Sequence, residues 1–171
     1  AEYNKKPVST ILENGFENAR LKTISLPETI KSIEGYAFSG CTSLESIHLS
    51  GTITEIKDYT FNECSSLKTV SIPNTITEIG DYAFNECTAL TTINISNSIT
   101  SIGDYAFYNC SILNEMALPA ALTTLGQYAF YKCEQAFGET ITIPQGIEKI
   151  PKYCFYNCTS IKTFAVPSQI T

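Results

Sequence analysis

Residues 76–98 read ITEIGDYAFNECTALTTINISNS, and this segment is one copy of a pattern that recurs along most of the 171-residue chain. The shared pattern is I-x-x-I-x-x-Y-A-F-x-x-C-x-x-L-x-x-I-x-L-P-x-x. Equivalent copies begin at intervals of 23 residues, with one expansion to 25, at Ile30, Ile53, Ile76, Ile99, Leu122, Ile147 and Ile170. A period of about 20–29 residues with fixed apolar positions is typical of a solenoid whose coils stack into a continuous core.

Each copy contains one predicted β-strand, in the part of the pattern written L-x-x-I-x-L. Val70 and Ile72 alternate there with Thr69 and Ser71, and alternation with a period of two indicates one buried and one exposed face. The other predicted strands contain the apolar pairs Ile47/Leu49, Ile93/Ile95, Met116/Leu118, Ile141/Ile143 and Phe164/Val166. A proline follows several strands and has no N–H, so it ends the strand ladder.

The segment G-D-Y-A-F-x-x-C is predicted to form one helical or 3₁₀ turn. Its Ala, Phe and Cys should face inward, and Asp81 or Asp104 could cap the turn. The predicted fold is therefore an α/β-type repeat solenoid, with short parallel strands on one side and turns or 3₁₀ segments on the other.

The chain is expected to be one continuous domain with a divergent first unit. Residues 1–29 are interpreted as an N-terminal capping repeat, because residues 8–29 keep Phe16, Leu21 and Pro27 but lose the cysteine and one residue of spacing. Residues 30–171 hold about six 23-residue repeats, the last one truncated. Nothing after Ile170 resembles a cap, so we expect that the natural protein continues or that another chain covers this end.

The composition and the absence of certain motifs argue against several classes of function. The chain is 43% hydrophobic and carries a net charge of −6, so it can bury a core and is a poor match for nucleic acid, whose binding needs clustered cations. No apolar run approaches the ~20 residues that span a bilayer, so we expect no membrane insertion. With a single His and neither a phosphate-binding loop nor a nucleophile motif, we expect no enzyme and no cofactor.

These repeats, with Y-A-F-x-x-C followed by L-x-x-I-x-L-P, resemble the leucine-rich repeats of the BspA-like type, found in bacterial cell-surface proteins and in surface proteins of some protozoan parasites. The resemblance is close over residues 30–171 and loose over 8–29. It implies a curved, right-handed leucine-rich-repeat solenoid with a concave sheet, a cell-surface or extracellular location, and adhesion to host matrix proteins, plasma proteins or other microbes. The departures are an expansion at residues 133–139 and Cys154 in the alanine position.

Two recurring polar positions have structural and chemical interpretations. Six of the seven cysteines share one position of the repeat and should form an inward column; buried free thiols are the preferred interpretation, with disulfides and a metal site as alternatives. Asp58, Asp81 and Asp104 share another position, where turn capping is preferred to a calcium site.

Two sets of residues are candidates for ligand binding. Tyr108, Tyr131 and Tyr156 form a column confined to the last three units, whereas another tyrosine column runs through every full unit and is interpreted as structural. The exposed strand positions Thr69, Ser71, Thr92, Asn94, Thr140 and Thr142 would suit a saccharide or an extended polar peptide. The alternatives are that the tyrosines shield the coil edge and that Thr and Ser merely suit exposed strands.

The first functional hypothesis is a non-enzymatic binding or adhesion module that recognises a protein or a glycan. The alternative is a structural spacer, or a segment that self-associates through its uncapped C-terminal repeat. About seven coils at ~4.8 Å each give a length of only about 34 Å, which is short for a stalk and favours binding.

Overall fold

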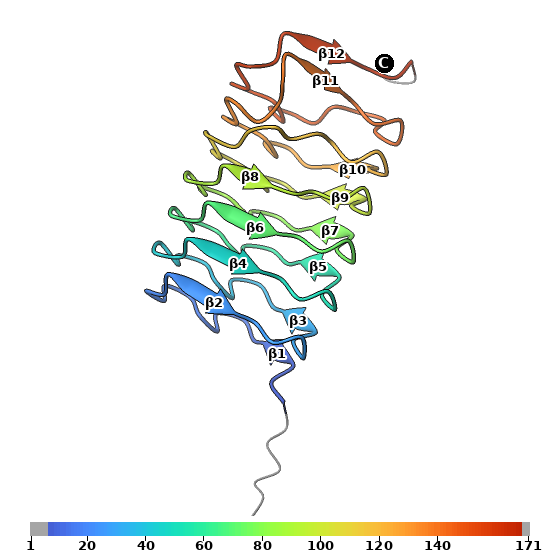
Figure 1. Ribbon diagram of the computed structural model, residues 1–171. Helices are drawn as coiled ribbons and strands as arrows, with labels where there is room; N and C mark the ends of the chain where they lie inside the picture. Colours follow the sequence, from blue (N-terminus) through green and yellow to red (C-terminus); the bar gives the residue numbers. More distant parts are fainter. Residues whose placement is uncertain (1–6, 169–171) are drawn as a thin grey trace, which may run out of the picture.

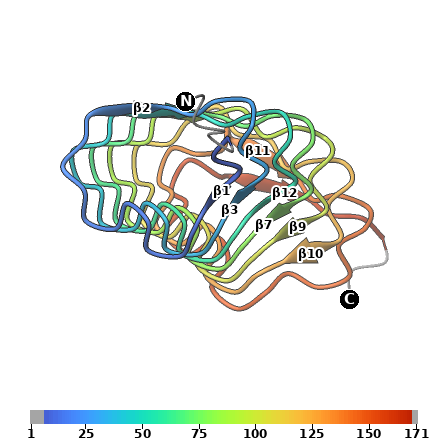
Figure 2. The ribbon, with the colours of Figure 1, turned by 90° about the horizontal axis from the view of Figure 1, so that it is seen from below.

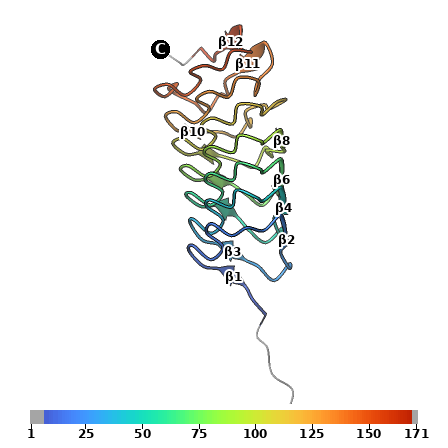
Figure 3. The same cartoon turned by 90° about the vertical axis from the view of Figure 1, so that its left-hand side faces the viewer.

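The computed structural model describes residues 7–168, which form a parallel β-solenoid of about seven coils (Figure 1). We number the coils by their repeats: coil 1 is 8–29, coil 2 is 30–52, coil 3 is 53–75, coil 4 is 76–98, coil 5 is 99–121, coil 6 is 122–146 and coil 7 is 147–168. The views along and across the stack show successive coils around a common interior (Figures 2 and 3).

The strands form two rows. The first row contains β2 (Thr23–Ser25), β4 (Ser46–His48), β6 (Thr69–Ser71), β8 (Thr92–Ile93), β11 (Thr140–Thr142) and β12 (Thr163–Ala165). The second row contains β1 (Thr10–Ile11), β3 (Ser32–Ile33), β5 (Glu55–Ile56), β7 (Glu78–Ile79), β9 (Ser101–Ile102) and β10 (Thr124–Leu125). Every pairing in either row is parallel and joins equivalent positions of neighbouring coils, such as Val70 with Ile93.

The first row confirms the strands predicted from the alternating pattern, except in coil 5. The second row, in the I-x-x-I part of the repeat, was not expected. Between residues 7 and 168 there is no helix and no 3₁₀ segment, so the helical component of the predicted α/β-type fold is not confirmed. The segment containing Tyr-Ala-Phe instead forms consecutive turns, because the tyrosine and the residue four positions later both have positive φ, as at Tyr82 (55°) and Glu86 (57°).

These turns are bonded to the next coil. The N–H groups of Tyr82, Phe84 and Glu86 donate to carbonyls of coil 5 at 2.9, 2.8 and 2.8 Å. A helical turn would direct N–H groups to carbonyls within its own coil, so stacking of the coils takes precedence over local helix formation.

The first row is interrupted at coil 5, where the strand predicted around Met116 and Leu118 is absent. Glu115 has φ of 55°, which rotates its peptide out of the extended conformation. The Met116 N–H donates to the Ala136 carbonyl at 2.7 Å rather than to a strand of coil 6. Ala136 and Phe137, in the expanded segment of coil 6, are buried at this point and prevent the regular pairing.

The second row consists of two sheets, β1 with β3 and β5 to β10, and glycines extend the hydrogen bonding of the second sheet at one repeat position. The N–H groups of Gly80, Gly103 and Gly126 donate to isoleucine carbonyls of the preceding coils at 2.7, 2.8 and 2.8 Å. A Cβ on Gly103 would lie 2.7 Å from the Asp81 nitrogen, so a side chain does not fit there without a shift of the backbone. Pro151 occupies this position in coil 7 and has no N–H to donate, and the row ends at β10.

The interior is a stack of equivalent side chains, as the repeat predicts. The rings of Phe38, Phe61, Phe84, Phe107 and Phe130 lie 5.2–5.5 Å apart and are fully buried. Alanines beside most of these rings and the column cysteines are also buried. Each coil thus depends on its neighbours for its core.

The two ends of the stack present apolar surface. Coil 1 pairs with coil 2 through β1 and β2, and its Val8 and Leu12 are 64% and 70% exposed beside an apolar hollow. Its role as a cap stays a prediction. Residues 1–6 and the start of a further unit at Ile170 lie outside the described residues.

Candidate functional site

The predicted binding residues lie on separate surfaces of the solenoid. Tyr108, Tyr131 and Tyr156, which we call the tyrosine wall, lie in the turn segments of coils 5, 6 and 7. Thr69, Ser71, Thr92 and Asn94 lie together on the first strand row, and Thr140 and Thr142 lie on β11, beyond the interruption.

The tyrosine wall is a stack of parallel rings. The ring centroids of Tyr108 and Tyr131 are 4.8 Å apart with an interplanar angle of 1°, and those of Tyr131 and Tyr156 are 4.9 Å apart at 10°. Tyr108 and Tyr131 are half-buried, whereas Tyr156 is 48% exposed. The wall therefore becomes more accessible toward coil 7.

A second tyrosine column supports the wall from the side. Tyr105, Tyr128 and Tyr153 contact Tyr108, Tyr131 and Tyr156 at centroid distances of 5.7, 5.6 and 5.8 Å, with interplanar angles of 42°, 48° and 82°. Tyr105 stacks in turn on Tyr82 and Tyr128 at 4.6 Å, and burial raises the pKa of the Tyr105 hydroxyl above its ordinary value. This column continues through coils 2–7, which supports its interpretation as structural.

In coils 2–4 the position of the wall is occupied by small polar side chains. Asn62 donates to the Ser39 hydroxyl at 3.3 Å, and Asn85 donates to the Asn62 side-chain oxygen at 2.8 Å. Side-chain hydrogen bonds thus join coils 2–4 at this position without any aromatic ring. The change to tyrosine from coil 5 onward is not required for stacking of the coils.

The geometry of the wall determines which groups a ligand can contact. Because the rings stack on each other, the faces between Tyr108, Tyr131 and Tyr156 are covered. Where the rings face each other, the groups left for a ligand are ring edges and hydroxyls, repeated at about the spacing of the coils. None of these three hydroxyls bonds to another group of residues 7–168, so all of them can bond to a ligand.

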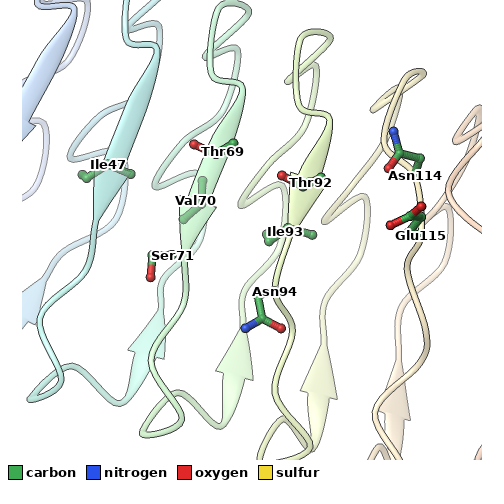
Figure 4. Close-up of a pocket in the computed structure, with 9 residues that line it drawn as sticks. All are labelled: Ile47, Thr69, Val70, Ser71, Thr92, Ile93, Asn94, Asn114 and Glu115. Atoms are coloured by element: carbon green, nitrogen blue, oxygen red, sulfur yellow. The ribbon is translucent and has the colours of Figure 1, made fainter.

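Four of the predicted strand residues line one hollow of about 400 Å³, which we call the sheet hollow (Figure 4). Thr69, Ser71, Thr92 and Asn94 are exposed there, and Ile47, Val70 and Ile93 form its floor. Asn114 and Glu115 of coil 5 form the remaining side. Thr140 and Thr142 instead line a smaller hollow of about 150 Å³ with Met116, Ala117, Leu118, Phe137 and Ile141.

Asn114 and Glu115 were not among the predicted binding residues. The signal was present in the sequence: Glu115 is the one charged residue in a position that holds Ser46, Thr69, Thr92, Thr140 and Thr163 in other units. The expansion at residues 133–139 of the following unit is a second departure from the repeat pattern, in the coil next to Glu115.

The aspartate column has a structural role that differs from the predicted one. The Oδ1 atoms of Asp58, Asp81 and Asp104 accept the N–H groups of Asp81, Asp104 and Gln127, each in the next coil, at 2.7–2.8 Å. They bridge coils instead of capping their own turns. In the described part of the chain, no group of three His, Cys, Asp or Glu side chains is arranged to hold a metal ion.

The cysteine column also connects coils, and all seven cysteines are buried and free. The Cys110 Sγ donates to the Phe84 carbonyl at 3.2 Å, and the Cys87 Sγ donates to the Phe61 carbonyl at 3.2 Å. Burial raises the pKa of both thiols well above the ordinary value. These cysteines are therefore structural donors and poor nucleophiles.

Comparison with known proteins identifies related repeats. The family described as the BspA type leucine-rich repeat region matches residues 9–136 and 77–171, with six copies. No curated protein matches the chain.

Several solved structures share the fold. A leucine-rich repeat protein from Bacteroides ovatus is similar, with a TM-score of 0.90 and 30% identity over 99% of this chain. A leucine-rich cell surface protein from Faecalibacterium prausnitzii has a TM-score of 0.68 and 27% identity over 94% of this chain. A Treponema pallidum leucine-rich repeat protein has a TM-score of 0.80, 24% identity over 88% of this chain, and 72% of its own length covered.

The chain spans only part of the first and second of these proteins, 44% of the Bacteroides protein and 52% of the Faecalibacterium protein. Within residues 7–168 there is no helix long and apolar enough to cross a membrane.

Proposed function

The chain belongs to the family of BspA-type leucine-rich repeat proteins, and on that premise we propose that it is a non-enzymatic binding module of a cell-surface or extracellular protein. Its ligand is a protein, bound at the tyrosine wall formed by Tyr108, Tyr131 and Tyr156. The surface location is supported by the similar Faecalibacterium protein, which is described as a cell surface protein.

The observation that carries the proposal is the local change of one repeat position from Ser39, Asn62 and Asn85 to three stacked tyrosines. The polar ladder already serves the fold in coils 2–4, so the rings supply something other than stacking of the coils. Tyrosine is enriched in protein interfaces because it offers a large rigid surface and a hydroxyl with little loss of conformational entropy.

The stacking of the wall favours a protein ligand over a glycan. A sugar ring binds best across the open face of an aromatic ring, and the faces between neighbouring rings of the wall are occupied. The accessible edges and hydroxyls instead match the mixed apolar and polar groups of a protein surface. Lys132, with its Nζ 5.8 Å from the Tyr131 ring centroid, adds a positive charge beside the wall.

The experiment is binding of the protein to immobilised matrix proteins, plasma proteins and glycans, measured by surface plasmon resonance. The variant Tyr108→Ser/Tyr131→Ser/Tyr156→Ser should lose at least tenfold in affinity for the ligand found, as expected when central aromatic residues are removed. The variant with three Tyr→Phe substitutions keeps the ring stack and tests the hydroxyls separately.

A matched control replaces Thr77, Thr100 and Thr123 with serine, in three successive coils outside the wall. Their hydroxyls donate to carbonyls of the preceding coils at 3.2–3.4 Å, and serine can retain these bonds. Binding that survives the three serines at the wall would refute the wall as the site. Absence of binding to every immobilised ligand would favour the structural spacer.

A further inference from the structure

Glu115 has a backbone conformation that the repeat does not explain. Every other non-glycine residue with positive φ among residues 7–168 occupies the tyrosine position or the position four residues later, and so recurs from coil to coil. Glu115, with φ of 55°, lies outside both positions. A positive φ is unfavourable for a residue with a Cβ, and such isolated outliers cluster at functional sites.

The consequence of this conformation is an unpaired strand edge inside the stack. Val70 of β6 pairs with Ile93 of β8, and Ile93 is the position that would pair next with coil 5. Asn114 still donates to the Thr91 carbonyl at 3.0 Å, but within the described structure no backbone hydrogen bond joins Ile93 to coil 5. Ile93, which is 9% exposed, is also one of the residues that line the sheet hollow.

The charge of this hollow is negative and uncompensated. Glu115 is exposed and lines the hollow beside Asn114, on the coil next to the one that carries Thr92 and Ile93 (Figure 4). It forms no ion pair with any residue from 7 to 168. The sequence holds no Lys or Arg between Lys68 and Lys132, and Lys68 itself is paired with Glu45 at 2.9 Å.

We infer that the sheet hollow binds an extended peptide segment of a partner protein, with a Lys or Arg side chain of that segment paired to Glu115. The peptide main chain lies along β8, where Ile93 offers unpaired hydrogen-bonding groups. Thr69, Thr92 and Asn94 bond to its polar side chains. Addition of an extended segment to an unpaired strand edge is a recurrent mode of peptide recognition.

Two observations favour a peptide over a saccharide. No aromatic ring lines the hollow, so a sugar would lack a stacking platform. A carboxylate without a cationic partner, in a chain with a net charge of −6, is complementary to a basic side chain, and arginine can bond to a carboxylate through two parallel hydrogen bonds. The inference rests on the proposed binding function but concerns a different surface from the tyrosine wall.

The test uses two fluorescein-labelled heptapeptides, Thr-Ser-Thr-Arg-Thr-Ser-Thr and the same sequence with Glu in place of Arg, titrated with the protein in fluorescence anisotropy. The Arg peptide should bind at least tenfold more tightly than the Glu peptide. Glu115→Gln should weaken the Arg peptide about tenfold, and Glu115→Gly should do the same while it retains the backbone conformation, since glycine readily adopts positive φ.

The control variant is Tyr131→Ser, which should leave peptide binding unchanged. Equal binding of the two peptides, unchanged affinity in Glu115→Gln, or no binding at millimolar protein would each overturn the inference. If an immobilised protein is bound through the tyrosine wall while the peptides fail, the proposed function stands and this inference alone is wrong. If the Arg peptide binds but the wall variant loses no affinity for any protein, the assignment of the wall is wrong and this inference stands.

Discussion

The cysteine column should make the protein sensitive to alkaline pH. Burial raises the pKa of the Cys87, Cys110 and Cys133 thiols well above the ordinary value. At neutral pH these thiols are protonated in both the folded and the unfolded chain, so they contribute no pH dependence. Above about pH 8.5 the unfolded chain loses the protons while the folded chain keeps them, and the free energy of unfolding must fall as pH rises.

The size of the effect follows from the number of buried thiols. Each one lowers the free energy of unfolding by about 1.4 kcal/mol per pH unit once the unfolded thiol is ionised. Cys64, Cys154 and Cys158, whose pKa values burial also raises, act in the same direction. The six thiols should therefore remove about 7–8 kcal/mol between about pH 8 and pH 9.5, below the ordinary pKa of tyrosine. Such a loss is a large fraction of the roughly 5–15 kcal/mol that stabilises a typical domain.

The assay is urea unfolding, followed by circular dichroism at closely spaced pH values with a phosphine reductant present. Cys110→Ser should reduce the loss by about one sixth, because a serine hydroxyl can donate to the Phe84 carbonyl but does not ionise in this range. Thr88→Ser, beside Cys87, is the matched control and should leave the slope unchanged. A free energy of unfolding that is constant from pH 8 to pH 9.5, or the same slope in Cys110→Ser, would refute the reasoning.

Three further substitutions test the stacking interactions by urea unfolding. Phe84→Ala removes a fully buried ring between Phe61 and Phe107 and should cost about 3–5 kcal/mol; a loss below about 1 kcal/mol would contradict its core position. Gly103→Ala places a Cβ 2.7 Å from the Asp81 nitrogen and should lower the free energy of unfolding by about 2–4 kcal/mol. An unchanged urea midpoint would contradict this prediction, because it would mean that the two coils move apart at little cost to admit the methyl group. Burial raises the pKa of Asp81, so the wild type should gain stability relative to Asp81→Asn as pH falls through that pKa; a relative loss would reverse the assigned sign.

Much of the fold was predictable because the repeat reports which side chains every coil must bury. The inward positions of Ala83, Phe84 and Cys87 are confirmed, and so is the strand at 69–71. The second strand row was missed because each strand holds only two residues, as in Glu78–Ile79, too few for an alternating pattern to be visible. The turns were mistaken for helical ones because bonds to the next coil, invisible in a single repeat, determine their geometry.

The site was predictable only in part. Tyr108, Tyr131 and Tyr156 share a repeat position, so their stacking follows from the period of the sequence. The strand predicted around Met116 is absent because of two local features, the conformation of Glu115 and the buried Ala136 of the next coil. Deviations of this kind depend on contacts between coils, which a pattern averaged over repeats cannot contain.

The interruption at coil 5 also affects how the stack resists bending. At coil 5 the first strand row is absent, between β8 of coil 4 and β11 of coil 6, while β7, β9 and β10 of the second row remain hydrogen-bonded across it. Along the first row coil 5 keeps only isolated backbone hydrogen bonds to its neighbours, such as those from Asn114 to Thr91 and from Met116 to Ala136. We therefore expect a bend of the stack at coil 5 to open on the side of the sheet hollow, where fewer hydrogen bonds oppose it.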